Sequence, residues 1–215
     1  MVCLRKNNLH MLDQHYYYCI EKSVTAEFTD RGSRFIAYAF PIASIEDFKE
    51  CLNEVKKSHP KASHYCFAYR LGHDGSIYRV TDAGEPSGSA GRPILGQIDS
   101  RHLTNTLVVV VRYFGGTLLG VPGLINAYKS TASMALQLTP ILKKKIEVDY
   151  EIQFDYTVMN EVMMVIKKFE CTVLHQEQQL FSVFQIGIPI LNQKEVLEKF
   201  AEIRGVNIKK KAVQD

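Results

Sequence analysis

Four consecutive valines, residues 108–111, are the feature of this chain that most restricts its fold. β-Branched residues favour extended backbone, and an apolar run without alternation is typical of a strand buried on both faces. The run continues through Arg112 and Tyr113 to the pair Gly115 and Gly116. We therefore predict a central strand of an α/β sheet, with Arg112 and Tyr113 leaving it at its carboxyl end, where open α/β sheets place their ligands.

The glycines after this strand suggest an anion site formed by backbone groups. Gly115 and Gly116 permit positive φ or close backbone approach, and the helix expected after them offers free N–H groups and a positive dipole end. Their spacing to Gly120 and Gly123 does not fit G-x-G-x-x-G, and Lys129 follows a tyrosine where a Walker lysine would follow glycine. The spacing excludes a standard nucleotide loop, and a tight strand-to-helix connection without a ligand fits it equally well.

A second polar segment, residues 81–95, is rich in Gly, Pro and Ser and is predicted to be a loop. It carries two carboxylates, two hydroxyls and a guanidinium close together, from Asp82, Glu85, Ser87, Ser89 and Arg92. Loops held on a rigid sheet commonly carry function, although a plain turn also accounts for this composition.

Residues 82–95 and 112–120 closely resemble the paired signatures of the IMPACT/YigZ family, and residues 61–69 resemble its third signature. The three segments follow the family's order, and the resemblance extends from about residue 16 to the C-terminal region. It implies an N-terminal α/β domain similar to the second domain of small-subunit ribosomal protein five. As in the bacterial two-domain branch, it also implies a C-terminal ferredoxin-like domain. Eukaryotic relatives regulate translation in the pathway that senses amino-acid starvation, and bacterial relatives are inferred to act in translation or to bind RNA.

The chain departs from the family pattern at four positions. Ala83 stands where the family usually has a second acidic residue, and Ser89 where it prefers Thr. Pro122 occupies a position that is commonly glycine, and Lys129 replaces a glycine after the tyrosine. The missing carboxylate at Ala83 argues against a metal held by paired acids, so we expect neither a metal nor a cofactor.

Composition favours a cytoplasmic protein with reduced thiols. The 215 residues, 46% of them hydrophobic, suffice for one large core or two small ones. No apolar stretch reaches the roughly 18–20 residues of a membrane span, and the N-terminal residues lack the apolar region of a signal peptide. Five cysteines without C-x-x-C spacing argue against disulfides and a zinc ribbon. The net charge of +3 is only a weak indication of nucleic-acid binding.

Apolar periodicity predicts an α+β chain with two domains, 16–139 and 147–210, joined by a linker over 140–146. In the first domain we expect strands at 34–41, 64–69 and 77–80, a helix opened by Ser44 with Asp47 in a capping box, and helices at 90–99 and 124–138. We expect residues 1–15 to form a disordered extension, within which Met11 offers a second start.

The second domain begins with an alternating segment, residues 147–156. The alternation places five side chains on one buried face, those of Val148, Tyr150, Ile152, Phe154 and Tyr156. Further apolar patterns predict a helix, two strands, a second helix and a last strand, which gives the order β-α-β-β-α-β of the ferredoxin-like fold. We assign Met159, Met163 and Met164 to the core or to a domain contact.

We hypothesise a cytoplasmic, translation-associated regulator whose N-terminal domain binds RNA, the ribosome or a translation factor. The residues expected to bind nucleic acid or an anion are Arg92, Arg112, Tyr113, Gly115, Gly116, Lys129 and His64, with Asp82, Glu85, Ser87 and Ser89 as the supporting loop. Asp82 and Glu85 could instead orient the arginines. Two alternatives stay open: an enzyme acting on a phosphorylated small molecule at the glycine-rich turn, and a pure protein-interaction module. The enzyme is the less favoured, because G-x-S-x-G and H-E-x-x-H are both absent.

Overall fold

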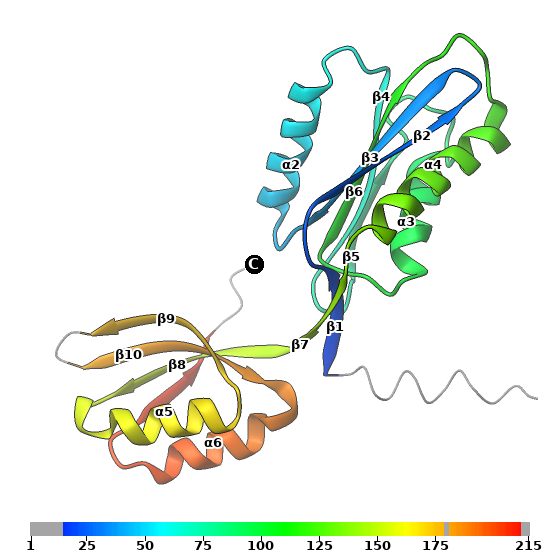
Figure 1. Cartoon of the computed structure of the whole chain (residues 1–215). Coiled ribbons are helices and arrows are strands. Elements are labelled where there is room, and N and C mark those ends of the chain that lie inside the picture. Colours follow the sequence, from blue (N-terminus) through cyan, green and yellow to red (C-terminus); the bar gives the residue numbers. More distant parts are fainter. Residues whose placement is uncertain (1–14, 179–180, 212–215) are drawn as a thin grey trace, which may run out of the picture. The chain divides into compact units, whose positions relative to one another are not determined.

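The computed structural model describes residues 15–178 and 181–211, which fall into two compact units (Figure 1). The N-terminal unit is Tyr17–Lys144, and the described part of the C-terminal unit consists of residues 145–178 and 181–211 together with His15 and Tyr16. Most of the expected N-terminal extension, residues 1–14 including the alternative start Met11, lies outside the described residues.

The segment expected to be a linker, residues 140–146, is largely a strand. Strand β7 (Ile141–Lys145) pairs with β1 (Tyr16–Ile20) in a two-stranded sheet. The lysine run within β7 suggested a solvated connection, but strand pairing joins backbone groups and leaves exposed side chains free to be charged. The boundary between the two units, at Lys144 and Lys145, lies within this segment, which is a paired strand over most of its length.

A five-stranded sheet forms the centre of the N-terminal unit. Its strands are β2 (Val24–Asp30), β3 (Ser33–Pro41), β4 (His64–Leu71), β5 (Ile77–Thr81) and β6 (Thr106–Tyr113), in the spatial order β2-β3-β6-β4-β5. The predicted central strand is confirmed, because β6 lies in the middle and Leu107 to Val111 are fully buried. All neighbouring strands are antiparallel, so the rule that places ligands at the carboxyl ends of strands in open α/β sheets does not apply to this sheet. Arg112 and Tyr113 are the last residues of β6 and do not leave the sheet.

Helices cover both faces of this sheet (Figure 1). α3 (Gly91–Asp99) and α4 (Gly120–Gln137) pack on one face, and α2 (Ile45–Ser58) packs on the other. Successive residues of β6 consequently join different cores, with Val110 on the side of α3 and α4 and Val111 on the side of α2. This two-sided burial explains why β6 has no polar alternation.

α2 begins at a local sequence signal, whereas α4 begins earlier than the sequence predicts. Ser44 accepts a hydrogen bond from the backbone N–H of Asp47, whose carboxylate accepts one in return, so the predicted capping box of α2 is confirmed. α4 begins at Gly120, earlier than the expected start at residue 124. Pro122 is compatible with this earlier start because the first turn of a helix has no use for its missing N–H group.

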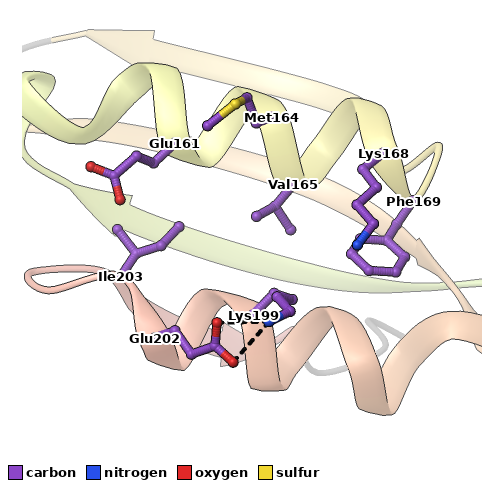
Figure 2. A pocket seen from close by; sticks show the side chains of 8 residues that line it. All are labelled: Glu161, Met164, Val165, Lys168, Phe169, Lys199, Glu202 and Ile203. Atoms are coloured by element: carbon purple, nitrogen blue, oxygen red, sulfur yellow. Dashed lines mark hydrogen bonds and ion pairs between the residues drawn. The ribbon is translucent and has the colours of Figure 1, made fainter.

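The C-terminal unit has the element order expected from the sequence. It consists of β8 (Glu147–Phe154), α5 (Met159–Lys168), β9 (Thr172–Gln178), β10 (Ser182–Pro189), α6 (Gln193–Glu202) and β11 (Asn207–Lys210), with the short helices η1 (Tyr156–Val158) and η2 (Ile190–Asn192) before α5 and α6. The four strands form an antiparallel sheet in the order β11-β8-β10-β9. α5 and α6 lie side by side over one face of it (Figures 1 and 2).

Two side chains of this unit differ from expectation. Tyr156 was expected on the buried face, but β8 ends at Phe154 and the tyrosine, at the start of η1, is 72% exposed. Met159 and Met163 pack against the core, whereas Met164 is 65% exposed. Periodicity located α5 correctly, but it did not separate the methionines on its inner and outer faces.

His59 at the end of α2 joins this helix to the sheet. Its ring lies between two hydroxyls, with Nε2 at 2.5 Å from Tyr38 Oη and Nδ1 at 2.9 Å from Tyr113 Oη. The Tyr65 hydroxyl donates a hydrogen bond to the His59 carbonyl oxygen. Partial burial, with a smaller contribution from Arg34, lowers the pKa of the His59 imidazole below its ordinary value.

This lowered pKa makes the stability of the N-terminal unit depend on pH. The unfolded chain takes up a proton on His59 as the pH falls through about 6.5, but the folded chain resists it, so this stabilisation is complete above that pH and is lost below it. We expect His59→Gln to reduce the free energy of unfolding by about 1–2 kcal/mol at pH 7. The difference from wild type should shrink towards pH 5 in urea titrations followed by circular dichroism. His73→Gln, at an exposed histidine of the same unit, is the control. If the loss of unfolding free energy in His59→Gln is the same at all pH values, His59 is not the source of the pH dependence.

Candidate functional site

Asp82 fixes the loop that leads into α3. One carboxylate oxygen accepts hydrogen bonds from the backbone N–H groups of Ala90 and Gly91, at 3.0 and 2.8 Å, and the other accepts one from Gly88 at 2.8 Å. Burial of Asp82 raises its pKa, but these three N–H groups and the nearby Arg92 outweigh burial, so the pKa lies below its ordinary value. Asp82 thus acts as a remote cap for a helix whose own first residues supply no capping side chain.

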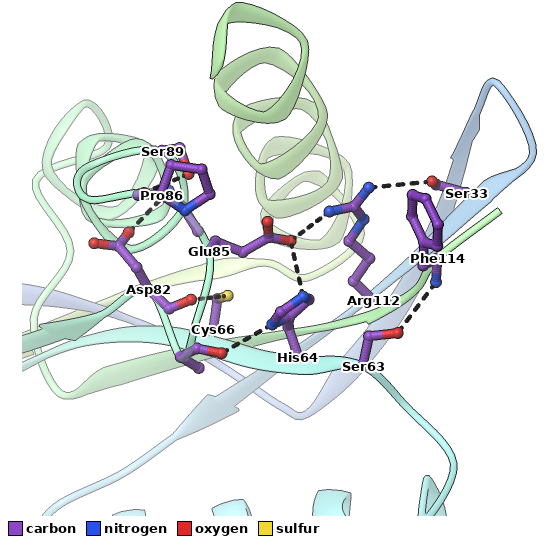
Figure 3. Close-up of polar contacts among 12 residues, drawn as sticks. Ser33, Ser63, His64, Cys66, Asp82, Glu85, Pro86, Ser89, Arg112 and Phe114 are labelled. Atoms are coloured by element: carbon purple, nitrogen blue, oxygen red, sulfur yellow. Dashed lines mark hydrogen bonds and ion pairs between the residues drawn. The ribbon is translucent and has the colours of Figure 1, made fainter. Parts of the chain in front are cut away.

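Glu85 and Arg112 form a buried ion pair beneath this loop (Figure 3). Glu85 Oε1 lies 2.7 Å from an Arg112 guanidinium nitrogen, and their side chains are 4% and 6% exposed. The same carboxylate oxygen accepts a hydrogen bond of 2.8 Å from the hydroxyl of Tyr128 in α4. The pair therefore joins the loop, the central strand and a helix at one point.

Three further groups hold the Arg112 guanidinium. Its second terminal nitrogen donates to Ser33 Oγ at 3.3 Å, and its carbon Cζ lies 5.4 Å from the ring centre of Phe35 and 5.5 Å from that of Phe114. The guanidinium is enclosed between two aromatic rings and faces a carboxylate, an arrangement in which it is already neutralised. Arg112 was predicted to contact phosphate, but in the structure its guanidinium group makes its contacts within the N-terminal unit.

His64 and Cys66 border the ion pair from β4. His64 Nδ1 lies 2.9 Å from the Ala83 carbonyl oxygen, and its Nε2 lies 3.9 Å from Glu85 Oε1. Cys66 Sγ lies 3.0 Å from the Asp82 carbonyl oxygen and 3.3 Å from Tyr128 Oη. Burial raises the pKa of the Cys66 thiol to about 12 and also raises the pKa of Tyr128, so both groups stay protonated at neutral pH. Neither is suited to act as a nucleophile.

Gly115 of the glycine-rich turn lies close to the turn between β2 and β3, whereas Gly116 has open space around it. A Cβ atom on Gly115 would lie 1.9 Å from the backbone of Gly32, in the turn between β2 and β3, so the glycine permits a close backbone approach. The Gly115 N–H donates to Ser33 Oγ at 3.2 Å, and the N–H of Phe114 donates to Ser63 Oγ at 3.3 Å. Two amides expected to face a ligand are therefore satisfied internally.

The structure brings together some of the predicted site residues and separates others. Asp82 and Glu85 of the loop lie near Arg112 and His64, and the fold adds three residues that were not predicted for the site: Tyr128, Cys66 and Ser33. Tyr113 points to the opposite face of the sheet, because side chains alternate along β6, and it contacts His59. Ser89 is buried and donates to the Pro86 carbonyl oxygen, whereas Ser87, Arg92 and Lys129 are exposed.

An apolar surface lies next to the buried cluster. Four hydrophobic side chains at the end of β6 and the start of α4 are exposed to 49%, 82%, 45% and 38%: Phe114, Leu118, Val121 and Ile125. We call these four residues the 114–125 surface. Phe114 is also the ring that covers Arg112, so this surface is anchored directly on the ion pair. The sequence did not indicate this surface, because the pattern of apolar residues does not show which of them the fold leaves exposed.

The part of the chain that the structure describes contains no group of His, Cys, Asp and Glu side chains that could hold a metal ion. None of the helices in residues 15–178 and 181–211 is long and apolar enough to cross a membrane.

Comparisons with known proteins agree with the motifs. Residues 31–136 match the family model described as the Impact N-terminal domain. An IMPACT family member of Haemophilus influenzae is 34% identical over 177 residues, which cover 80% of this chain and 84% of that protein. The IMPACT family member YvyE of Bacillus subtilis is 34% identical over 148 residues, 69% of this chain and 68% of that protein. A crystal structure of a hypothetical protein is 26% identical, with a TM-score of 0.72, and covers 94% of this chain and 100% of its own.

We expect loss of one partner from the buried ion pair to reduce the free energy of unfolding more than loss of one partner from an exposed ion pair. Glu85→Leu leaves the Arg112 charge and the Tyr128 hydroxyl buried without their acceptor, and should reduce the free energy of unfolding by about 3–5 kcal/mol in urea titrations. Combining it with Arg112→Met should restore much of that loss, because the uncompensated charge is removed. Glu27→Gln breaks the exposed pair with Arg34 and serves as control, with little expected change. A double variant no more stable than Glu85→Leu would argue against this account.

The two glycines of the turn should respond differently to alanine. Gly115→Ala forces the backbone at Gly32 to move and should lower the melting temperature more than Gly116→Ala. Gly116 has φ +85° and open space around its Cβ position, so alanine there costs only the backbone strain of about 1–2 kcal/mol. Equal melting temperatures for the two variants would contradict the prediction, because they would mean that the backbone at Gly32 moves aside at little energetic cost.

Proposed function

The chain belongs to the IMPACT family, and on this premise we propose that it is a cytoplasmic regulator of translation that binds a protein of the translation apparatus through the 114–125 surface. The translational part rests on family membership, since the resemblance implies that eukaryotic relatives regulate translation. The binding surface and the class of partner are argued from the geometry of the N-terminal unit.

The observation that carries the proposal is the exposure of four hydrophobic side chains on a rigid base. Scattered apolar residues are common on protein surfaces, but grouped ones favour an interaction site. Leu118 is 82% exposed, and Val121 and Ile125 follow it at helical spacing on α4. The Glu85–Arg112 pair beneath Phe114 holds the start of this surface in place. Less conformational entropy is therefore lost when a partner binds.

A protein partner fits the N-terminal unit better than a phosphate backbone. Of the predicted phosphate contacts, Arg112 is neutralised by Glu85, Tyr113 faces the other side of the sheet and the Gly115 amide is bonded to Ser33. Arg92 and Lys129 remain exposed, and they support RNA as a second candidate partner. Two exposed cations supply a smaller electrostatic attraction than sequence-independent RNA binding normally uses.

The C-terminal sheet adds little support for RNA binding. Its uncovered face carries Asp149 and Glu151 of β8, which alternate with the buried Tyr150 and Ile152. Lys209 lies opposite Glu151 across the strand pair and balances that charge. Sheets that bind single-stranded RNA use exposed aromatic residues and positive charge, and this strand supplies neither.

The enzyme alternative has no comparable support. A general acid or base needs a carboxylate free to exchange protons, but Glu85 is engaged by Arg112 and Tyr128, and Asp82 by three backbone N–H groups. The Cys66 thiol, with a pKa near 12, is no nucleophile at neutral pH.

Co-sedimentation of the full chain with ribosomes from a cell extract, over a series of salt concentrations, tests the proposal. We expect wild type to sediment with ribosomes and Leu118→Glu to reduce the bound fraction at least about tenfold, because a charge replaces a central apolar contact. Leu138→Glu, at an exposed leucine just beyond the other end of α4, is the matched control and should bind like wild type.

The salt dependence separates the candidates. Protein docking predicts a shallow decrease with salt that the double change Arg92→Ala with Lys129→Ala leaves unaltered. RNA binding instead predicts that the bound fraction falls steeply with salt and that the double change removes this steep dependence. In that case Leu118→Glu should still bind to ribosomes. If wild type does not associate with ribosomes or their factors at any salt concentration, the proposed function is wrong.

A further inference from the structure

The C-terminal unit carries a groove between α5 and α6 that plays no part in the site described above. It has a volume of about 420 Å³ and lies on the outer side of the two helices (Figure 2). Its apolar lining comes from Met164, Val165 and Phe169 at α5 and from Ile203 at the end of α6. The floor of the groove is therefore the outer edge of the C-terminal core, where Phe169 and Ile203 lie.

Met164 distinguishes this groove from an ordinary gap between packed helices. Its neighbours Val162 and Ile166 are buried against the sheet, whereas Met164 is 65% exposed. Phe169 and Ile203 are 6% and 8% exposed, so they form a fixed floor and Met164 forms an adaptable wall. An unbranched thioether side chain of this kind adapts to the shape of apolar side chains from a partner.

Opposite charges mark the two ends of the groove. Glu161 lies in the first turn of α5 and Lys168 in the last, and both line the groove (Figure 2). Lys199 and Glu202 of α6 lie between them but neutralise each other in an ion pair of 2.8 Å. Within residues 15–178 and 181–211, neither Glu161 nor Lys168 has an ion-pair partner, although Lys168 lies 4.9 Å from the ring centre of Phe169.

The distance between these charges matches a short helix. Glu161 and Lys168 are separated by seven positions of α5, which corresponds to about 10 Å or two helical turns. A helix of two or three turns lying in the groove would place apolar side chains at i, i+3 or i+4, and i+7 over Met164 and the floor. Its ends would then lie beside the two free charges.

We propose that this groove binds an amphipathic helix of another protein, with acidic residues at the N-terminal end of that helix and basic residues at its C-terminal end. The dipole of any helix favours this charge order, which places the acidic end at Lys168 and the basic end at Glu161. The bound helix runs antiparallel to α5. This binding mode is independent of the proposed function, because it uses a different unit of the chain and different residues.

The test uses two helix-stabilised synthetic peptides of about 14 residues, cross-linked because unmodified peptides of this length are marginally helical in water. Both carry leucines at i, i+3, i+4 and i+7; one has acidic N-terminal and basic C-terminal residues, and the other has the reverse. We expect the full chain to bind the first peptide about fivefold more tightly in fluorescence anisotropy, since each surface ion pair adds a modest amount.

Two variants locate the binding. Met164→Glu should weaken binding of the first peptide at least about tenfold. The double change Glu161→Lys with Lys168→Glu should invert the preference between the two peptides. Lys194→Glu with Glu198→Lys swaps an exposed pair on α6 that does not line the groove, and should change neither affinity nor preference. Circular dichroism checks that each variant is folded.

Several outcomes would overturn the proposal. Equal affinity for the two peptides, an unchanged preference in the charge-swapped variant, or no binding at millimolar peptide would each refute it. If sedimentation shows a dimer that Met164→Glu dissociates, the occupant is a second copy of this chain. If peptides bind only after removal of residues 1–14, the occupant is the chain's own N-terminal segment. Because the ribosome assay depends on Leu118 and the peptide assay on Met164, failure of one proposal is distinguishable from failure of the other.

Discussion

The ion pair between Glu85 and Arg112 is the interaction on which the N-terminal unit depends. It connects a loop, the central strand and α4, which are distant in sequence, at a point where both charged side chains are buried. A charge buried in this way is tolerated only when its partner is present, so the loop must close over the sheet for the unit to be stable. Phe114, Phe35 and Ser33 complete the enclosure of the guanidinium.

This arrangement separates the family motifs into a part that builds the fold and a part that faces outward. Asp82, Glu85, Ser89 and Arg112 are used internally, as a helix cap, an ion pair and a loop hydrogen bond. The same segments expose Ser87, Arg92 and the 114–125 surface. Under the proposed function, the internal residues support the 114–125 surface, and such support reduces the entropy lost on binding.

The two units offer different surfaces. The 114–125 surface of the N-terminal unit is an exposed apolar patch, and the groove between α5 and α6 is a concave apolar strip with a charge at each end. Together they are consistent with a chain that binds two partners, or two parts of one partner, by separate units.

The sequence by itself determined most helices and strands apart from β1, β2 and β7, the buried face of β8 as far as Phe154, the capping box of α2 and the family. Each of these depends on side chains close together in the chain, where period and spacing are sufficient. It did not determine that Arg112 and Tyr113, although adjacent, lie on opposite faces of an antiparallel sheet, nor that Gly115 meets Gly32. It also could not show that a lysine-rich segment pairs as a strand or that Met164 faces solvent. Only the tertiary structure decided these points, because burial and ion pairing arise from contacts between segments that the linear order does not bring together.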